Sequence, residues 1–314
     1  MTVHGQQLPG SSSSGEAPDA SNRLSFVGVT TAQSAIMRVF PVWAAHLGLG
    51  DVVMSGHDLP MHAPRERYRE VVAEMRSGRS ELGGLVTTHK IDLFSACRDL
   101  FGYIDFYADL CGEVSCLSKR DGVFRAHAKD PIACGRAMDA FVPEGHWSDA
   151  DAGALLFGAG GSSIAMTLHL MTVREPGDRP HRIVVVDRNP ARLLSMRELH
   201  ERLDTGVAVE YRENLDAHEN DRLLAELPAG SLVVNATGMG KDTPGSPITD
   251  DAAFPEGGMI WDLNYRGELD FLHQARRQQP DHGLAIEDGW RYFLHGWTVA
   301  MEEVFGIEIT PVDL

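Results

Sequence analysis

A glycine-rich loop between an apolar run and a helix-like segment constrains the fold of this chain more than any other feature. The segment reads LLFGAGGSSIAM, and its loop comprises Gly158, Ala159, Gly160, Gly161 and Ser162. Glycines here permit a tight turn, and the helix that follows would direct free N–H groups at a bound phosphate. We therefore expect these five residues to bind the pyrophosphate of a dinucleotide, with a plain tight turn as the alternative.

The next apolar run, VVVDRNPAR, ends on an acid that bears on the choice of dinucleotide. A carboxylate at this strand tip, Asp187, would accept hydrogen bonds from the adenosine ribose, which favours NAD. Arg188 and Arg192 would instead suit the 2′-phosphate of NADP. Because Asp187 would repel a phosphate beside it, we expect NAD, with NADP as the alternative. A capping aspartate with two surface arginines is the ordinary explanation of the same residues.

Strand-like apolar runs alternate with helix-like segments on both sides of the glycine loop. Such alternation implies right-handed crossovers and a parallel sheet, and Asp121-Gly122 signals a hairpin in the first half. We expect an α/β fold of two domains, an α/β substrate domain and a Rossmann-type doubly wound dinucleotide-binding domain. The expected boundaries are a disordered tail at 1–22, a substrate-binding catalytic domain at 23–130 that is rejoined by a returning helix in 288–314, and a nucleotide-binding domain at 131–287.

Composition excludes several classes of partner. The net charge of −17 repels phosphate backbones and anionic lipid, so we expect neither nucleic acid nor a membrane as a partner. No apolar run approaches the roughly 20 residues of a membrane span, and the N-terminal segment has no apolar centre typical of a secretory signal. The cysteines show no metal-ligand spacing, so we expect reduced thiols, no metal and a cytoplasmic protein. They are Cys97, Cys111, Cys116 and Cys134.

The run LVTTHK ends a strand-like segment on Lys90, where a helix-like segment begins. A second helix start lies at Asp130, which Pro131 follows. Acid and proline are typical of a first helical turn, so a solvated lysine and a capping aspartate are the ordinary explanations.

Six segments in one order nevertheless point to a family. They read GGLVTTHK, RDGVFRAHAKDPIACG, GAGGSSIA, LVVNATGMG, IWDLNYRGELDFLHQA and EDGWRYFLHGWTVAMEEVFG. Together they resemble the shikimate dehydrogenase family, oxidoreductases of shikimate and quinate, over most of residues 24–306. The resemblance implies that Lys90 and Asp130 are catalytic and face one cleft, although the lysine segment is one residue shorter than usual and lacks a proline.

The resemblance also implies which residues border the cofactor and the substrate. The loop beside the nicotinamide would hold Asn235, Ala236, Thr237 and Gly240, and Tyr265 would border the substrate. A ring alcohol loses a hydride from carbon and a proton from oxygen. A lysine and a carboxylate near that oxygen can bind it and stabilise developing charge.

The substrate-holding positions depart from the family pattern. Of two serines that hold a carboxylate, the first is kept as Ser34 and the second is Ile36; a glutamine of the last helix falls on Gly296. Asparagine and threonine positions near the hairpin are occupied by Ser115, Ala128 and Lys129. Because a site built for a hydroxyl discriminates strongly, we expect a substrate other than shikimate itself. The substrate-binding residues we expect are Ser34, Thr87, Ser115, Tyr265 and His295.

We therefore expect hydride transfer between NAD(P) and a secondary alcohol of a carbocyclic acid or polyol. The alternatives are a methylenetetrahydrofolate dehydrogenase-like enzyme and a non-catalytic dinucleotide-binding regulator. The expected partner is a small-molecule substrate. A monomer and a homodimer, and both directions of the reaction, stay open.

Overall fold

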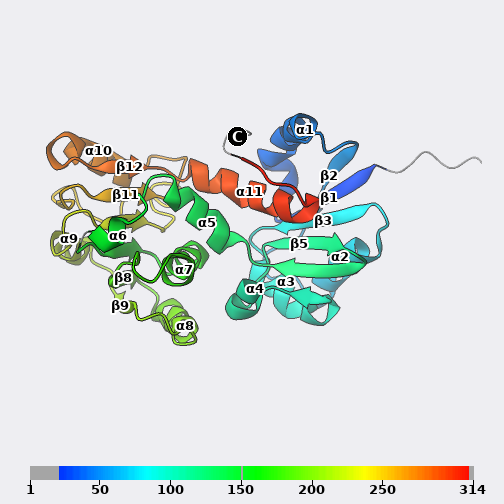
Figure 1. Ribbon diagram of the computed structural model, residues 1–314, viewed down its shortest axis with the longest axis horizontal. Coiled ribbons are helices and arrows are strands. Elements are labelled where there is room, and N and C mark those ends of the chain that lie inside the picture. The colour runs from blue at the N-terminus through cyan, green and yellow to red at the C-terminus, as the bar shows by residue number, and fades with distance from the viewer. Residues whose placement is uncertain (1–20, 150, 311–314) are drawn as a thin grey trace, which may run out of the picture.

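The computed structural model describes residues 21–149 and 151–310, and within them the strands form two sheets of six (Figure 1). The first sheet has the order β2-β1-β3-β5-β6-β4, and the second has the order β12-β11-β10-β7-β8-β9. The predicted α/β class with two sheet-containing halves is confirmed. The predicted tail at 1–22 lies mostly outside the described residues. Its last residue, Asn22, is the first residue of β1.

The first half of the chain alternates short strands and helices. Its elements are β1 (Asn22–Gly28), the 3₁₀ turn η1 (Thr31–Gln33), α1 (Ile36–His46), β2 (Val52–Asp58), α2 (Arg65–Ser77), β3 (Glu81–Val86), α3 (Lys90–Cys97), the 3₁₀ turn η2 (Arg98–Leu100), β4 (Tyr103–Ile104), α4 (Phe106–Cys111), β5 (Cys116–Arg120), β6 (Val123–His127) and α5 (Asp130–Asp139).

The second half repeats this alternation around the glycine loop. Its elements are α6 (His146–Asp149), β7 (Ala154–Phe157), α7 (Gly161–Leu168), the π-helical turn η3 (His169–Val173), β8 (Arg182–Asp187), α8 (Pro190–His200), β9 (Ala208–Glu213), α9 (Ala217–Ala225), β10 (Leu232–Asn235), β11 (Met259–Asp262), α10 (Asp270–His282), β12 (Ala285–Glu287) and α11 (Trp290–Phe305).

The first sheet is mixed because of the predicted hairpin. Strand β1 runs parallel to β2 and β3, whereas β5 pairs antiparallel with both β3 and β6. The hairpin is confirmed, and both turn residues, Asp121 and Gly122, have positive φ (52° and 74°). The chain leaves the hairpin at α5, so the N-terminus of α5 lies beside the ends of β3 and β6.

The second sheet is parallel throughout, as predicted. Chain order runs from β7 through β8 to β9 on one side and from β10 through β11 to β12 on the other. The order therefore reverses between β7 and β10, and ligands of open α/β sheets bind beyond the carboxyl ends of the strands at such a point. The glycine loop follows β7 at this position.

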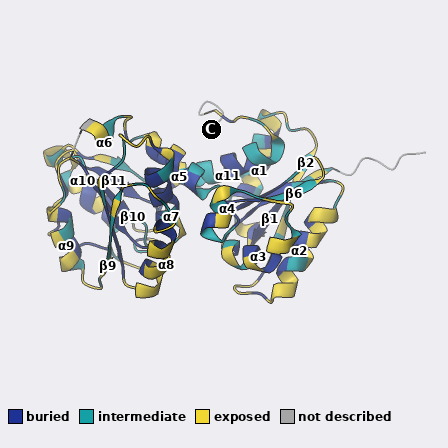
Figure 2. Cartoon of the chain, turned by 60° about the horizontal axis from the view of Figure 1, so that its bottom comes forward, coloured by how far each residue is buried: buried dark blue, intermediate teal, exposed yellow. Residues whose placement is uncertain are grey.

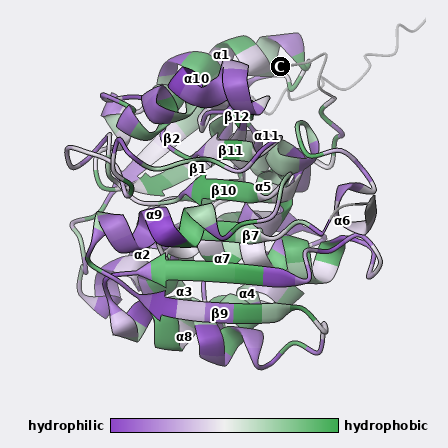
Figure 3. Cartoon of the chain, turned by 90° about the vertical axis from the view of Figure 1, so that its left-hand side faces the viewer, coloured by the Kyte–Doolittle hydropathy of each residue, from purple (hydrophilic) through white to green (hydrophobic). Residues whose placement is uncertain are grey.

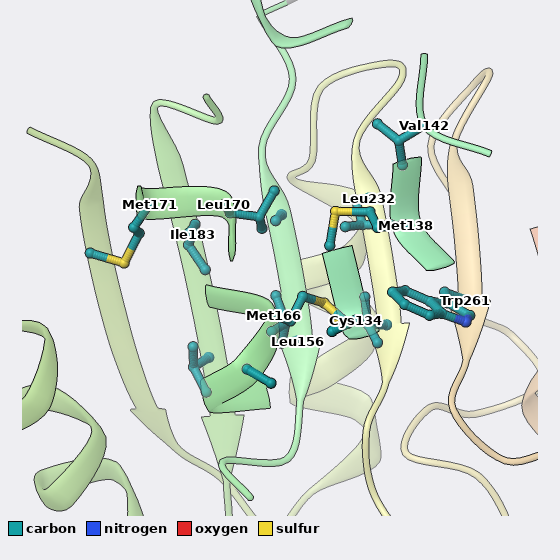
Figure 4. Packing of buried hydrophobic residues seen from close by; sticks show 14 of the residues in the cluster. Cys134, Met138, Val142, Leu156, Met166, Leu170, Met171, Ile183, Leu232 and Trp261 are labelled. Atoms are coloured by element: carbon teal, nitrogen blue, oxygen red, sulfur yellow. The ribbon is translucent and has the colours of Figure 1, made fainter. Parts of the chain in front are cut away.

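Apolar side chains cover both faces of this sheet. In Figure 4, Cys134 of α5 lies beside Leu156 of β7 and Met166 of α7, and Met138 of α5 lies beside Leu232 of β10. Figure 2 shows the outward faces of α2, α8 and α9 exposed, and Figure 3 shows β10 hydrophobic in the interior while α9 is largely hydrophilic. Burial of the apolar side chains on both faces of the sheet is the main source of stability.

The last helix joins the two halves. Helix α11 follows β12 of the second sheet and lies along α5 towards the first sheet (Figure 1). Its Trp297 packs edge-on against Phe26 of β1, with ring centroids 5.0 Å apart, and Met301 lies in the same cluster. Among the described residues, no helix has both the length and the apolar character needed to cross a bilayer.

Candidate active site

A cleft of about 840 Å³ lies where the two halves meet. Its walls come from β1 and η1, the end of β3, the starts of α3, α5 and α7, the segment after β11, and α11. The carboxyl ends of β3 and β7 both lead into it, so two strand-to-helix loops from different sheets face one space.

Lys90 and Asp130 form an ion pair in this cleft. They are the first residues of α3 and α5, and each side chain is largely buried, with 24% and 19% exposed. The turn that places Lys90 is tight, because Thr88 adopts a positive φ of 59° between the end of β3 and the helix. The structure thus brings together two residues that are 40 positions apart in sequence.

The surroundings of Lys90 keep its ammonium group charged. Burial opposes the charge, but the carboxylates of Asp130 and Glu113 and the hydrogen bond from the lysine to Asp130 outweigh it and raise the pKa of Lys90. A lysine of this kind donates hydrogen bonds and stabilises negative charge, and it is a poor base at neutral pH.

Glu113 is an acid beside this pair that the sequence did not single out. It precedes Val114, whose N–H donates to the Lys90 carbonyl at 3.1 Å. Two residues on, the Ser115 hydroxyl accepts from the Lys129 N–H at 2.7 Å. Burial, the largest influence, raises the pKa of Glu113 to about 7; Lys90 lowers it and Asp130 raises it.

Tyr292 of α11 is a second missed residue. Its phenol lines the cleft and lies near Ser162 of the glycine loop and near Asp130. Burial raises the pKa of Tyr292, and the charge of Asp130 adds to the effect. A tyrosine in a helix that is apolar on one face gives no signal of this kind, because only the fold brings it to the loop.

Four of the five expected substrate residues line the cleft, namely Ser34, Thr87, Ser115 and Tyr265. His295 does not: its ring Nδ1 is buried without a hydrogen-bond partner among the described residues, and burial lowers its pKa. Gly296, next to it, is the residue that faces the cleft.

The glycine loop has the shape that a pyrophosphate requires. Gly158 has a φ of 103°, and a Cβ there would lie 2.8 Å from the Ala236 carbonyl oxygen. Gly160 and Gly161 are different, because a Cβ at either would meet nothing within 4 Å. They border open space at the N-terminus of α7, where N–H groups are free for an anion.

Asp187 holds this loop from the tip of β8. One carboxylate oxygen accepts from the Ala159 N–H at 2.7 Å, and the other accepts from the Asn189 N–H at 2.8 Å. The carboxylate is buried, whereas Arg188 and Arg192 are exposed and make no ion pair with any described residue. The sequence predicted that Asp187 accepts hydrogen bonds from the adenosine ribose. It did not indicate that Asp187 also shapes the loop.

The loop after β10 is shaped by amides. The buried Asn235 accepts from both the N–H and the hydroxyl of Thr237, and Asn264 donates to the Thr237 carbonyl at 3.2 Å. Gly240 has a φ of 86°. The Ala236 backbone lies against Gly158, so the two expected cofactor loops contact each other.

No protein-family model matches the chain. Two curated relatives are named shikimate dehydrogenase (NADP(+)). The one from Streptococcus thermophilus is 27% identical over 183 residues, 57% of this chain and 59% of that protein. The one from Symbiobacterium thermophilum is 30% identical over 164 residues, 51% of each chain. The chain thus matches little more than half the length of these relatives.

Solved structures match the fold over nearly the whole chain. Shikimate 5-dehydrogenase from Listeria monocytogenes, in complex with shikimate and NAD, has a TM-score of 0.74 at 18% identity and covers 96% of both chains. 5-Ketofructose reductase of Gluconobacter has a TM-score of 0.69 at 16% identity, covering 94% of this chain and 97% of its own. Quinate dehydrogenase from Corynebacterium glutamicum, in complex with NAD, has a TM-score of 0.71 at 21% identity, covering 92% and 95%.

Proposed function

Since the chain belongs to the shikimate/quinate dehydrogenase family, we propose that it is an NAD(P)-dependent oxidoreductase acting on a secondary alcohol. The observation that carries the proposal is the Lys90–Asp130 ion pair in the cleft between the two halves. A structural ion pair with no catalytic role would not need to face a cleft that the glycine loop also borders.

The residues of the cleft divide the chemistry between them. A nicotinamide dinucleotide, when bound, accepts a hydride from the carbinol carbon or returns it to the ketone. In the oxidation, the hydroxyl proton passes to the Asp130 carboxylate as the C–O bond becomes a carbonyl. The Lys90 ammonium donates a hydrogen bond to the same oxygen and stabilises its developing negative charge. In the reduction the proton returns from Asp130 to the oxygen.

Gly160 and Gly161 fit a dinucleotide because they leave open space at a helix N-terminus, and Gly158 makes the tight turn that leads to them. We propose NAD as the preferred form. Asp187 at the tip of β8 carries a negative charge beside the ribose position, which disfavours a 2′-phosphate. The exposed Arg188 and Arg192 are the groups that would oppose this preference.

Steady-state assays with cyclic secondary alcohols and both dinucleotides test the proposal. Carbocyclic hydroxy acids and polyols should be oxidised, with shikimate among the poorer substrates because Ile36 and Gly296 replace polar groups of the family. Tight dinucleotide binding with no turnover of any alcohol, in either direction, would replace the proposal with a non-catalytic dinucleotide-binding role.

A further inference from the structure

The cleft is basic although the chain as a whole is strongly acidic, with a net charge of −17. Four of the five charged residues that line it are basic. Lys90 is paired with Asp130, and Lys129 is paired with Glu303 at 2.7 Å. The other two basic residues, Arg38 and Arg266, are exposed and have no acidic partner within the described part of the chain.

Arg38 is placed to act together with a hydroxyl. It lies on α1, Ser34 lies two residues before that helix with an extended backbone, and both residues line the cleft. The residue between them, Ile36, is buried in the core with Phe26 and Trp297 and offers no polar group. A guanidinium and a hydroxyl that border one cleft can bind a carboxylate or another small acid group.

A second part of the cleft has unfilled room over Gly296. This glycine lies in the middle of α11, has no positive φ, and a Cβ added to it would meet nothing within 4 Å. Glycine is unfavourable in a helix interior, so neither the backbone nor local packing explains it. The absence of a side chain at Gly296 leaves a gap in the wall of the cleft beside Phe293 and Trp297, which both line it.

Aromatic rings continue from this gap towards the surface. Phe293 packs against Tyr265 with ring centroids 5.2 Å apart, and it stacks on Trp290 at 5.3 Å with an interplanar angle of 25°. Trp290 is 48% exposed, so the row of rings reaches the surface. Flat aromatic surfaces of this kind suit a flat apolar group, since offset and edge contacts between rings add to area burial.

We propose that the substrate is an anionic carbinol larger than a single ring acid, with its acid group bound between Ser34 and Arg38 and an apolar, flat substituent in the gap over Gly296 beside Phe293. This inference rests on the proposed dehydrogenase function and adds the chemical class of its substrate. The Lys90–Asp130 pair lines the same cleft and would meet the reacting oxygen of the ring.

Matched ketones test both subsites through their reduction with NADH or NADPH. The set is 3-oxocyclohexanecarboxylate, its carboxamide, and the same carboxylate carrying a phenyl substituent at each remaining ring carbon in turn. The protein should show a kcat/KM at least about 10-fold higher for the carboxylate than for the carboxamide. At least one phenyl-substituted carboxylate should exceed the unsubstituted one by a similar factor.

Two variants assign these preferences to residues. Arg38→Gln should reduce the carboxylate-to-carboxamide ratio by about 10-fold or more, and Arg266→Gln, the matched control, should reduce it less. Gly296→Gln should abolish the preference for the phenyl-bearing ketone, because the new side chain occupies the gap. Thermal unfolding of Gly296→Gln should occur at the same or a higher temperature, which separates filling of the gap from loss of the fold.

The contrary results are equally distinct. Equal kcat/KM for the carboxylate and carboxamide would overturn the acid subsite, as would a larger effect of Arg266→Gln than of Arg38→Gln. A phenyl group that lowers kcat/KM at every ring position would overturn the subsite over Gly296. Failure to reduce any ketone of the set, while cyclic alcohols without an acid group are oxidised, would overturn the anionic class; failure with every alcohol and ketone would remove the dehydrogenase function itself.

Discussion

Replacing Glu113 with glutamine should make the protein more stable above neutral pH. The glutamate is half-buried beside the Lys90–Asp130 ion pair, and burial raises its pKa from 4.5 to about 7. The titratable groups that act on it are Lys90 and Asp130, and Glu113 in turn acts on Cys111 and Tyr292. Glutamine keeps the shape of the protonated side chain and does not ionise.

The expected size follows from the difference between the folded and unfolded pKa values. Between about pH 4.5 and 7 the folded protein holds a proton on Glu113 that the unfolded chain has lost, so stability falls as pH rises. A difference of roughly 2.5 pH units corresponds to about 3 kcal/mol once pH exceeds 7. The free energy of unfolding of Glu113→Gln should therefore exceed that of the parent by less than about 1 kcal/mol at pH 5 and by about 3 kcal/mol at pH 8.

Urea unfolding of both proteins at pH 5, 6, 7 and 8 measures this difference. Glu226→Gln is the matched control, because Glu226 is an exposed glutamate just after α9 and the change removes the same charge from the chain. The control should differ from the parent by an amount that hardly depends on pH. A Glu113→Gln curve parallel to the parent curve at all four pH values would refute the reasoning, since Glu113 would then titrate alike in both states.

Further predictions concern the catalytic pair and the cofactor. Lys90→Ala should lower kcat by roughly 10²–10⁴-fold, the usual contribution of a positioned acid–base group, with little change in dinucleotide affinity. Asp130→Asn should be similarly slow, and the double variant should lose much less than the product of both effects if the pair acts as a unit. Tyr292→Phe should weaken dinucleotide binding by roughly 2–10-fold in calorimetry, because the polar hydroxyl beside Ser162 of the glycine loop is lost. Calorimetry should also give tighter binding of NAD than of NADP, and Arg188→Ala should leave NAD affinity nearly unchanged. A 10-fold preference for NADP that Arg188→Ala abolishes would contradict the proposed preference for NAD.

Local signals carried the fold prediction. The glycine loop at 158–162 and the turn at Asp121-Gly122 each require positive φ or close backbone approach, and the chain offers glycine where the structure needs it. Strand neighbours could not be predicted in the same way. The placement of β5 between β3 and β6 depends on pairing across the sheet, which no local pattern of the hairpin encodes.

The cofactor residues show how a correct position can carry an incomplete interpretation. Asp187 lies at the strand tip, where the sequence placed it, but both of its oxygens accept backbone N–H groups of the loops around it. Asn235 likewise fixes the turn at Thr237 with its side-chain oxygen. A sequence motif contains such residues because they hold the loop in its conformation. The motif alone does not distinguish a side chain that contacts the ligand from one that contacts the backbone.

Glu113 and Tyr292 were missed because their chemistry depends on where the fold takes them. Gly112 ends α4 with a φ of 65°, and the next residue is a glutamate that is desolvated near Lys90. Tyr292 lies on the final helix, 162 positions after Asp130 in the sequence, and reaches it only because α11 packs along α5. Both therefore place ionisable groups around one ion pair. A substitution at Glu113 should alter the charge balance of Lys90 and Asp130 without replacing a residue that lines the cleft, whereas Tyr292 lines the cleft itself, one helical turn before Gly296.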